Sequence, residues 1–195
     1  MKVENQSCWH SRGYLPHYDC SETYQSLTFR LADSLPQQVL AELESELKSC
    51  EPQFIDLKRR RLIESYLDAG MGSCALKNPQ VAAVMQESLI RFDDDRYELI
   101  AWCIMPNHVH VLIKPKVSLS KIMQSWKSYT GKWAFKHNEA LCLGITKEAK
   151  SFWMREYWDS FIRNENHYFR TINYIHENPV KAGLCLKVED WPWSS

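Results

Sequence analysis

The chain has 195 residues, a formal net charge of zero and 45% hydrophobic residues, which fits one folded domain and excludes an intrinsically disordered chain. Its seven cysteines are odd in number and form no Cys-x-x-Cys pair, which argues against a disulfide framework or a cysteine zinc site and favours reduced thiols in a cytoplasm. No apolar stretch approaches the ~20 residues that span a bilayer, and the first residues lack the apolar segment of a signal peptide.

The first part of the chain predicts an arm, a strand and two helices. Residues 1–21, rich in His, Tyr and Pro, are expected to form an irregular N-terminal arm. Residues 23–31 combine β-branched and aromatic side chains and predict a strand. A helix is expected to begin at Ser34, which serves as its N-cap and is followed by a proline in the first turn. A second helix covers about 52–69 and ends at the glycines that follow.

The middle of the chain predicts a third helix and a β-hairpin. The helix begins at Asn78 and runs to about Arg91, and residues 50–92 are a possible helical insertion. Residues 97–105 and 108–114 are apolar runs that predict two strands. The Pro-Asn dipeptide between them predicts that these strands form a hairpin.

The last part predicts a helix, a loop, a strand and a final helix. Ser118 caps the first of these helices, and a polar loop is expected over 138–151. A short strand is expected at 157–163, and the final helix runs from Asn164 to about Pro179. The whole order of elements is typical of an α+β fold with an antiparallel sheet and helices packed on one side.

Local charge must carry any case for a nucleic-acid partner, because the net charge gives none. The segment 114–137 contains no Asp or Glu. Its Trp126 and Trp133 fall on the apolar stripe of the predicted helix, which favours core packing over stacking on bases. A second basic run covers residues 58–61, for which a solvated helix face is an equally good interpretation. The candidates for neutralising DNA phosphates are the lysines of the first segment: Lys114, Lys121, Lys127, Lys132 and Lys136.

Two histidines alternate with valines in the second strand of the predicted hairpin. Residues two apart in a strand project from one face, so His108 and His110 point the same way while Val109 and Val111 face the core. Two neighbouring neutral imidazoles form a bidentate ligand for a divalent metal. A complete site needs a third protein group, and a His-x-His pair alone is more often two exposed or hydrogen-bonded strand histidines.

The final helix offers both a third ligand and a nucleophile. Tyr174 and Asn178 lie one turn apart and share the face opposite the stripe that begins at Phe169. The Asn oxygen is a ligand for a hard metal, and the phenol is a nucleophile for a phosphorus atom. Arg170 lies on the same side and is a further candidate for contacting DNA. Taken alone, the pattern also fits a surface tyrosine and a helix-ending asparagine before Pro179.

Together the two patterns carry a resemblance to a known family. The sequence resembles the HUH single-tyrosine transposases, and most closely their REP-associated branch. His-x-His is common by itself, but its combination with YIHENPVKAG in this order is specific. Asn178 stands at a position where the insertion-sequence relatives carry Gln. The REP-associated branch has Asn at this position, as this sequence does. The resemblance covers the second half of the chain, in AWCIMPNHVHVLIKP at 101–115, SWKSYTGKWAF at 125–135, FWMREYWDSFIRNENHYFRTINYIHENPVKAGL at 152–184 and the tail WPWSS.

The resemblance implies a fold and a reaction. The expected fold is ferredoxin-like, the α+β HUH nuclease fold, in a single domain over residues 1–195. Mg²⁺ or Mn²⁺ is expected to be held by His108, His110 and Asn178. Tyr174 is expected to cleave single-stranded DNA beside a REP-type hairpin through a 5′-phosphotyrosine, which the 3′-hydroxyl of another end then attacks to join strands. The partner is single-stranded or hairpin DNA in a bacterial cytoplasm, and the choice between monomer and homodimer stays open.

Three alternatives remain beside this reading. An HUH replication or mobilisation nuclease often carries a third metal-binding histidine or paired tyrosines, and only one tyrosine matches here. A catalytically silent regulator that binds DNA hairpins with the same fold is disfavoured because all four expected site residues are present. A metal hydrolase would use an activated water and leave Tyr174 a structural role.

Overall fold

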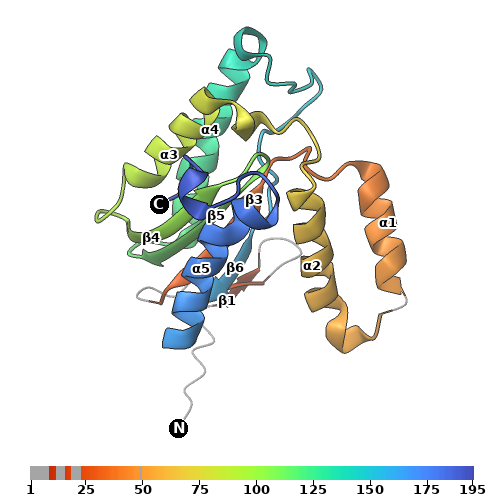
Figure 1. Ribbon diagram of the computed structural model, residues 1–195, viewed down its shortest axis with the longest axis vertical. Coiled ribbons are helices and arrows are strands. Elements are labelled where there is room, and N and C mark those ends of the chain that lie inside the picture. The colour runs from red at the N-terminus through yellow and green to blue at the C-terminus, as the bar shows by residue number, and fades with distance from the viewer. Residues whose placement is uncertain (1–8, 12–15, 19–22, 49) are drawn as a thin grey trace.

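The computed structural model describes residues 9–11, 16–18, 23–48 and 50–195 and is built around a four-stranded antiparallel sheet (Figure 1). The strands are β3 (Gln25–Arg30), β4 (Tyr97–Ile104), β5 (His108–Pro115) and β6 (Trp158–Phe161). Their spatial order is β4-β5-β3-β6, so β3, the first of these four strands along the chain, lies inside the sheet, as in a ferredoxin-like fold. The predicted α+β class and the predicted hairpin of β4 and β5 are confirmed.

One face of the sheet is covered by α3 (Pro79–Ile90) and α4 (Leu119–Leu141). The side chain of Asn78 accepts a hydrogen bond from the backbone of Gln80 and caps α3 as the sequence predicts. The buried side chains of this layer include Trp126, which is fully buried and donates its indole N–H to the hydroxyl of Tyr97 at 2.9 Å. Val109 and Val111 belong to the same core, which confirms their predicted orientation.

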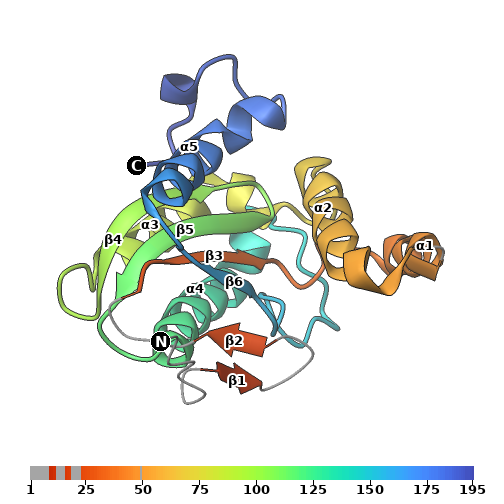
Figure 2. The same cartoon turned by 90° about the horizontal axis from the view of Figure 1, so that it is seen from below.

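The opposite face is crossed by α5 (Glu165–Lys181), as Figures 1 and 2 show. Ile175 of this helix is fully buried against Ala101 and Leu112. The structure therefore differs from the expectation that all helices pack on one side. The physical reason is visible in residues 101–113, all of which are buried: strands with side chains buried on both faces need a layer on each side.

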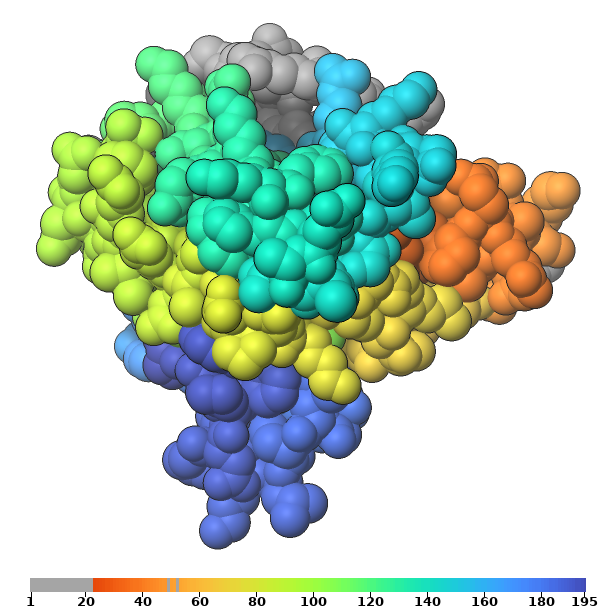
Figure 3. Space-filling view, turned by 90° about the horizontal axis from the view of Figure 1, so that it is seen from above, coloured from red at the N-terminus to blue at the C-terminus, as the bar shows by residue number. Residues whose placement is uncertain are grey.

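A helical hairpin stands beside the sheet. It consists of α1 (Gln37–Lys48), a 3-10 turn η2 (Pro52–Phe54) and α2 (Ile55–Asp68). Figures 2 and 3 show it protruding from one side of the molecule, and Figure 2 shows that α2 lies nearer to the sheet than α1. Its interface is a separate small apolar core made by Leu35, Val39, Leu43, Leu47, Ile63 and Leu67.

The predicted insertion at 50–92 consists of two parts that pack in different places. The first part, α2, pairs with α1, whereas α3 belongs to the sheet layers. The connection between them closes tightly at Gly72, which has a φ of +83° and where an added Cβ would lie 2.6 Å from the carbonyl oxygen of Asp33. The next residue, Ser73, donates its backbone N–H to the Asp33 carboxylate at 2.7 Å.

Several boundaries differ from the prediction. The helix α4 runs four residues into the segment 138–151, for which a loop was expected, and α5 continues through Pro179 to Lys181. A proline in the last turn costs only one helical hydrogen bond, and the helix is followed by Gly183 with a φ of +68°. The other short elements are η3 (Ala75–Lys77) and η4 (Val188–Asp190).

Most of the predicted N-terminal arm, residues 1–21, lies outside the described residues. Within it, β1 (Trp9–Ser11) and β2 (Pro16–Tyr18) pair as antiparallel strands. In the part of the chain that the structure describes, no helix has the length and apolarity needed to cross a membrane.

Candidate metal and nucleophile site

His108 and His110 form a buried pair on β5. Their Nε2 atoms lie 2.9 Å apart, and the side chains are 1% and 2% exposed. Both imidazoles project from the sheet face that α5 crosses, as strand alternation predicts. Two nitrogens at this spacing match the separation of roughly 3 Å between adjacent ligands of an octahedral ion with bonds of about 2.1 Å. The pair therefore fits a single divalent cation.

The neighbouring Asn107 fixes the tautomer of His108. Its amide nitrogen donates to the backbone carbonyls of Leu67 and Met71, both at 3.1 Å, and its amide oxygen lies 2.8 Å from Nδ1 of His108. An amide oxygen only accepts, so Nδ1 of His108 must carry the proton. The Nε2 lone pair of His108 is consequently turned toward His110 and is available to a metal.

Thr28, the hydrogen-bond partner of His110, is compatible with either tautomer of this imidazole. Nδ1 of His110 lies 2.9 Å from the hydroxyl of Thr28, on the adjacent strand. A hydroxyl both donates and accepts. In the metal-free pair Thr28 donates to Nδ1 while Nε2–H of His110 donates to His108. When Nε2 of His110 is a metal ligand, Nδ1–H donates to Thr28 instead.

Burial keeps both imidazoles neutral. It lowers the pKa of His108 to about 3, and it lowers the pKa of His110 well below its ordinary value, with the charges of His108 and Arg60 acting in the same direction. The neutral imidazole is the form that binds metals.

The helix α5 places Tyr174 against this pair. The rings of Tyr174 and His110 are 5.4 Å apart between centroids and meet nearly edge to face, at 80°. The helix starts at Asn164, whose side chain caps it by accepting from the backbone N–H of His167 at 2.9 Å. Phe169, which was expected on the buried stripe, is instead 55% exposed; the helix is rotated so that polar residues face the histidines.

Asn178 occupies the position one turn after Tyr174. It is 2% exposed, and its amide nitrogen donates to the backbone carbonyl of Tyr174 at 2.6 Å, so the oxygen remains the atom suited to a metal. The Asn178 side chain also lies close enough to the phenol to oppose the rise in its pKa. The four residues predicted for the site are thus brought together at one place.

The described residues contain no group of three His, Cys, Asp or Glu side chains able to hold a metal ion. Asn178, on the helix that faces the pair, is the residue of the predicted set that could add a third protein ligand through its amide oxygen.

The phenol of Tyr174 is strongly disposed to stay protonated. Its pKa is raised above the ordinary value, first by burial and next by the negative charge of Glu64, while Arg60 opposes the rise. Tyr174 is half-buried, and α2 supplies both of these charges. Formation of a phenolate therefore requires an added positive charge or a base at the site.

A basic cleft of about 320 Å³ leads to Tyr174 between α2 and α5. Its floor includes Ser26 of β3 and Ser160 of β6, so it runs over the sheet. Its charged and titratable lining residues are Arg60, Arg61, Glu64, His167, Arg170 and Tyr174. The basic run at 58–61 thus contributes to the site, although the sequence alone left it equally open to a purely solvated role.

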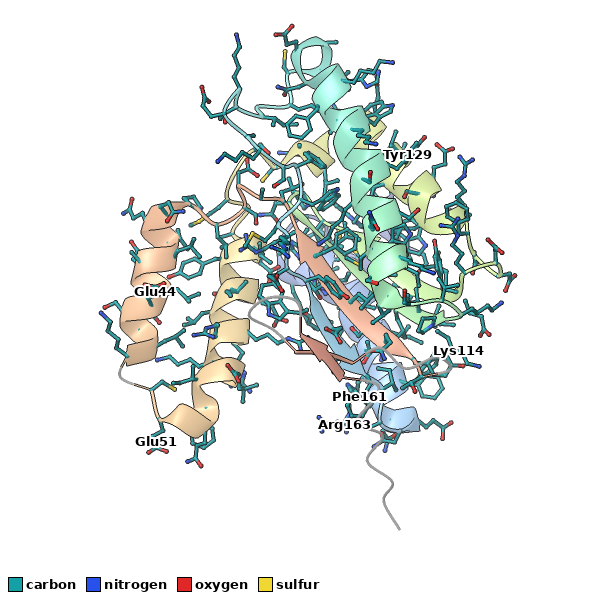
Figure 4. The ribbon with its side chains drawn as sticks, turned by 180° about the vertical axis from the view of Figure 1, so that it is seen from behind. Glu44, Glu51, Lys114, Tyr129, Phe161 and Arg163 are labelled. Atoms are coloured by element: carbon teal, nitrogen blue, oxygen red, sulfur yellow. The ribbon has the colours of Figure 1, made fainter. Side chains whose placement is uncertain are left out.

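The lysines predicted to contact DNA are divided between the two faces of the sheet. Lys121 and Lys132 line a groove of about 710 Å³ on α4, and Lys136 is exposed further along this helix. Figure 4 shows this side of the molecule, with α4 and its Tyr129 in front of the sheet. Figure 1 views the opposite side, with α5 in front. Lys114 lies at the end of β5, 3.9 Å from Glu98.

Lys127 is already engaged within the protein. Its ammonium donates to the backbone carbonyls of Met154 and Arg155 at 2.9 and 3.1 Å, and burial lowers its pKa to about 8. This lysine ties α4 to the segment before β6, which leaves little capacity for a phosphate.

Comparisons with known proteins identify the family to which the chain is similar. The model of a family described as "Transposase IS200 like" matches residues 78–178. A REP-associated tyrosine transposase of Escherichia coli (strain K12) is 29% identical over 113 residues, which cover 57% of this chain and 62% of that relative. A curated relative from Haemophilus influenzae is 28% identical over 111 residues, which cover 51% of this chain and 58% of the relative. The chain spans about three fifths of the length of these relatives.

One solved structure extends the likeness to the fold. It is described as a REP-associated tyrosine transposase bound to a REP hairpin, and it aligns with a TM-score of 0.55 over 93% of this chain and 81% of that chain. The two sequences are 20% identical, so this likeness supports the architecture of the sheet and its helices.

Proposed function

Because the chain belongs to the IS200-like transposase family, we propose that it is a metal-dependent endonuclease and strand transferase acting on single-stranded DNA. The observation that carries the proposal is the approach of Tyr174 to the buried imidazoles of His108 and His110. A purely structural tyrosine does not require two buried, neutral imidazoles beside it. In a nuclease of this family, the tyrosine and the imidazole pair would both take part in the reaction.

The residues of the site fit the metal that the family implies. His108 and His110 would hold Mg²⁺ or Mn²⁺ through Nε2, and Asn178 would add its amide oxygen. A bound divalent ion supplies Lewis-acid polarisation of a phosphate oxygen and a positive charge that favours a phenolate nearby. Asn107 and Thr28 hold the imidazoles in the ligating orientation through their second nitrogens.

The reaction is a transesterification at phosphorus. The oxygen of Tyr174 forms a bond to the scissile phosphorus, the bond from phosphorus to the 3′-oxygen breaks, and the proton lost by the phenol is balanced by the proton gained by the 3′-hydroxyl. The product is a 5′-phosphotyrosine. Because the ester bond is exchanged and not hydrolysed, the 3′-hydroxyl of a second strand reverses the step and joins the two ends.

The proposed substrate is single-stranded DNA beside a REP-type hairpin. The named relative and the solved hairpin complex support this choice, and the basic cleft beside Tyr174 supports a polyanionic strand. The site also differs from that of a replication nuclease, because no third histidine joins the pair among the residues that the structure describes.

The proposal is tested by incubating the protein with Mn²⁺ and a labelled oligonucleotide that carries a REP-type hairpin, followed by a denaturing protein gel. A labelled protein band that disappears in Tyr174→Phe is the expected result. Cleavage that survives in Tyr174→Phe would instead identify a metal hydrolase. Hairpin binding without cleavage or adduct, with Mn²⁺ present, would identify a silent regulator.

A further inference from the structure

The helical hairpin of α1 and α2 lies outside the residues that match the family model, which begin at residue 78. It nevertheless forms one wall of the cleft at Tyr174, because Leu57, Arg60, Arg61 and Glu64 of α2 all line it. Figure 4 shows how far the hairpin extends from the sheet, with Glu44 on α1 and Glu51 at its tip. An accessory element therefore completes a cleft whose other wall is α5.

The hairpin is fixed to the site by buried contacts. Asn107, which orients His108, donates to the carbonyls of Leu67 and Met71 at the end of α2. Trp158 of β6 packs against the apolar core of the hairpin. The position of α2 is thus tied both to the metal-ligating pair and to the sheet, so its exposed arginines project from a firmly held support.

The arginines of the two walls differ in how they are engaged. Arg60 donates to Glu64 at 3.1 Å, and its charge acts on the pKa values of Tyr174, His110 and His167. No carboxylate among the described residues pairs with Arg61 of α2 or with Arg170 of α5. Both of these side chains are exposed, so the two walls present free guanidinium groups across the cleft.

We propose that the α1–α2 hairpin is a clamp for one DNA strand, in which Arg61 and Arg170 bind phosphates on either side of the strand that leads to Tyr174. This inference rests on the proposed function and names the surface that serves it. A guanidinium binds a phosphate in a bidentate manner and stays charged at every relevant pH. The cleft, at about 320 Å³, is far too small to enclose a double helix.

Glu64 makes the clamp selective for anions that bind at several points. Its carboxylate holds Arg60 beside the nucleophile, so an arriving phosphate must compete with it for the guanidinium. A free phosphate or a short anion competes at one point only, whereas a strand is held at several points at once. The clamp therefore favours a polymeric anion.

Binding is measured by fluorescence anisotropy with a labelled single-stranded oligonucleotide on the Tyr174→Phe background, between about 50 and 200 mM salt. Arg61→Ala combined with Arg170→Ala is expected to weaken binding at least tenfold at the lower salt. Each lost phosphate contact should also reduce the slope of log K against log salt by about 0.7. A duplex of the same sequence should bind the parent protein much more weakly than the single strand.

The matched control removes two exposed arginines that do not line the cleft, Arg59 and Arg91. Arg59→Ala with Arg91→Ala should leave the affinity within twofold. The clamp is refuted if the two double variants weaken binding equally, or if only substitution of the lysines in the α4 groove weakens it. The adduct assay keeps this outcome separate: a Tyr174-dependent adduct formed at the parent rate by the Arg61/Arg170 variant would refute the clamp and leave the proposed function standing.

Discussion

At the level of single residues, the proposed metal site depends on which nitrogen of each histidine carries a proton. Asn107 has no freedom in this respect, because its nitrogen is held by two carbonyls and its oxygen is left for His108. Thr28 has both options and suits both states of His110. One partner is therefore rigid and the other adaptable, which fits the proposal that the pair would bind a metal through Nε2.

Asn107→Ala should disorganise this arrangement. With no acceptor at Nδ1, His108 populates the tautomer that protonates Nε2, and Mn²⁺ affinity is expected to fall roughly 10- to 100-fold. The measurement is a Mn²⁺ titration followed by electron paramagnetic resonance, together with ¹⁵N spectra of the imidazoles in the metal-free protein. Unchanged affinity and an unchanged tautomer would show that Asn107 has only a structural role.

Glu64→Gln should make Tyr174 a better nucleophile. The carboxylate raises the pKa of the phenol, so removing its negative charge lowers that pKa and moves the rise of activity with pH to lower pH. Adduct formation at neutral pH is expected to increase several-fold. The check is the pH dependence of single-turnover adduct formation; a profile that stays in place or moves to higher pH contradicts the assignment.

At the scale of elements, the sequence predicts what depends on local periodicity. The pairing of β4 with β5, the shared face of His108 and His110 and the capping of α3 by Asn78 all follow from neighbours a few residues apart. The face that α5 presents to the sheet cannot be predicted from this periodicity. The apolar stripe places Phe169 on the buried face, whereas this side chain is exposed in the structure.

The basic cleft could not be derived from any local pattern. Its walls, α2 and α5, are separated by about half of the chain, and their approach is decided by packing between distant elements. The lysine-rich α4 gave the stronger local signal, yet it lies on the other face of the sheet. A run of basic residues in a sequence predicts a positively charged surface. It does not predict whether this surface lies next to the functional site.

The connection after α2 should be sensitive to a single methyl group. Gly72→Ala places a Cβ 2.6 Å from the Asp33 carbonyl oxygen at a φ of +83°, and is expected to lower the free energy of unfolding by at least about 2 kcal/mol. Gly183→Ala is the control, since its φ of +68° is similar and nothing lies within 4 Å. Urea denaturation of both variants measures the difference; equal losses would contradict the steric explanation.

At the scale of the whole molecule, a net charge of zero conceals an uneven distribution. The cleft at Tyr174 carries arginines from two helices, while the groove on α4 carries lysines on the other side of the sheet. Binding should accordingly depend on salt through the few contacts of the cleft and not through a general attraction. The fold thus gathers positive charge where the proposed nucleophile lies.

The most direct measurement is the site of covalent attachment. After reaction with Mn²⁺ and a hairpin oligonucleotide, the protein is digested with a protease and a nuclease and its peptides are sequenced by tandem mass spectrometry. We expect a nucleotide linked through phosphate to the phenol of Tyr174. A nucleotide attached to any other side chain, or cleaved DNA without an attached nucleotide, would contradict it.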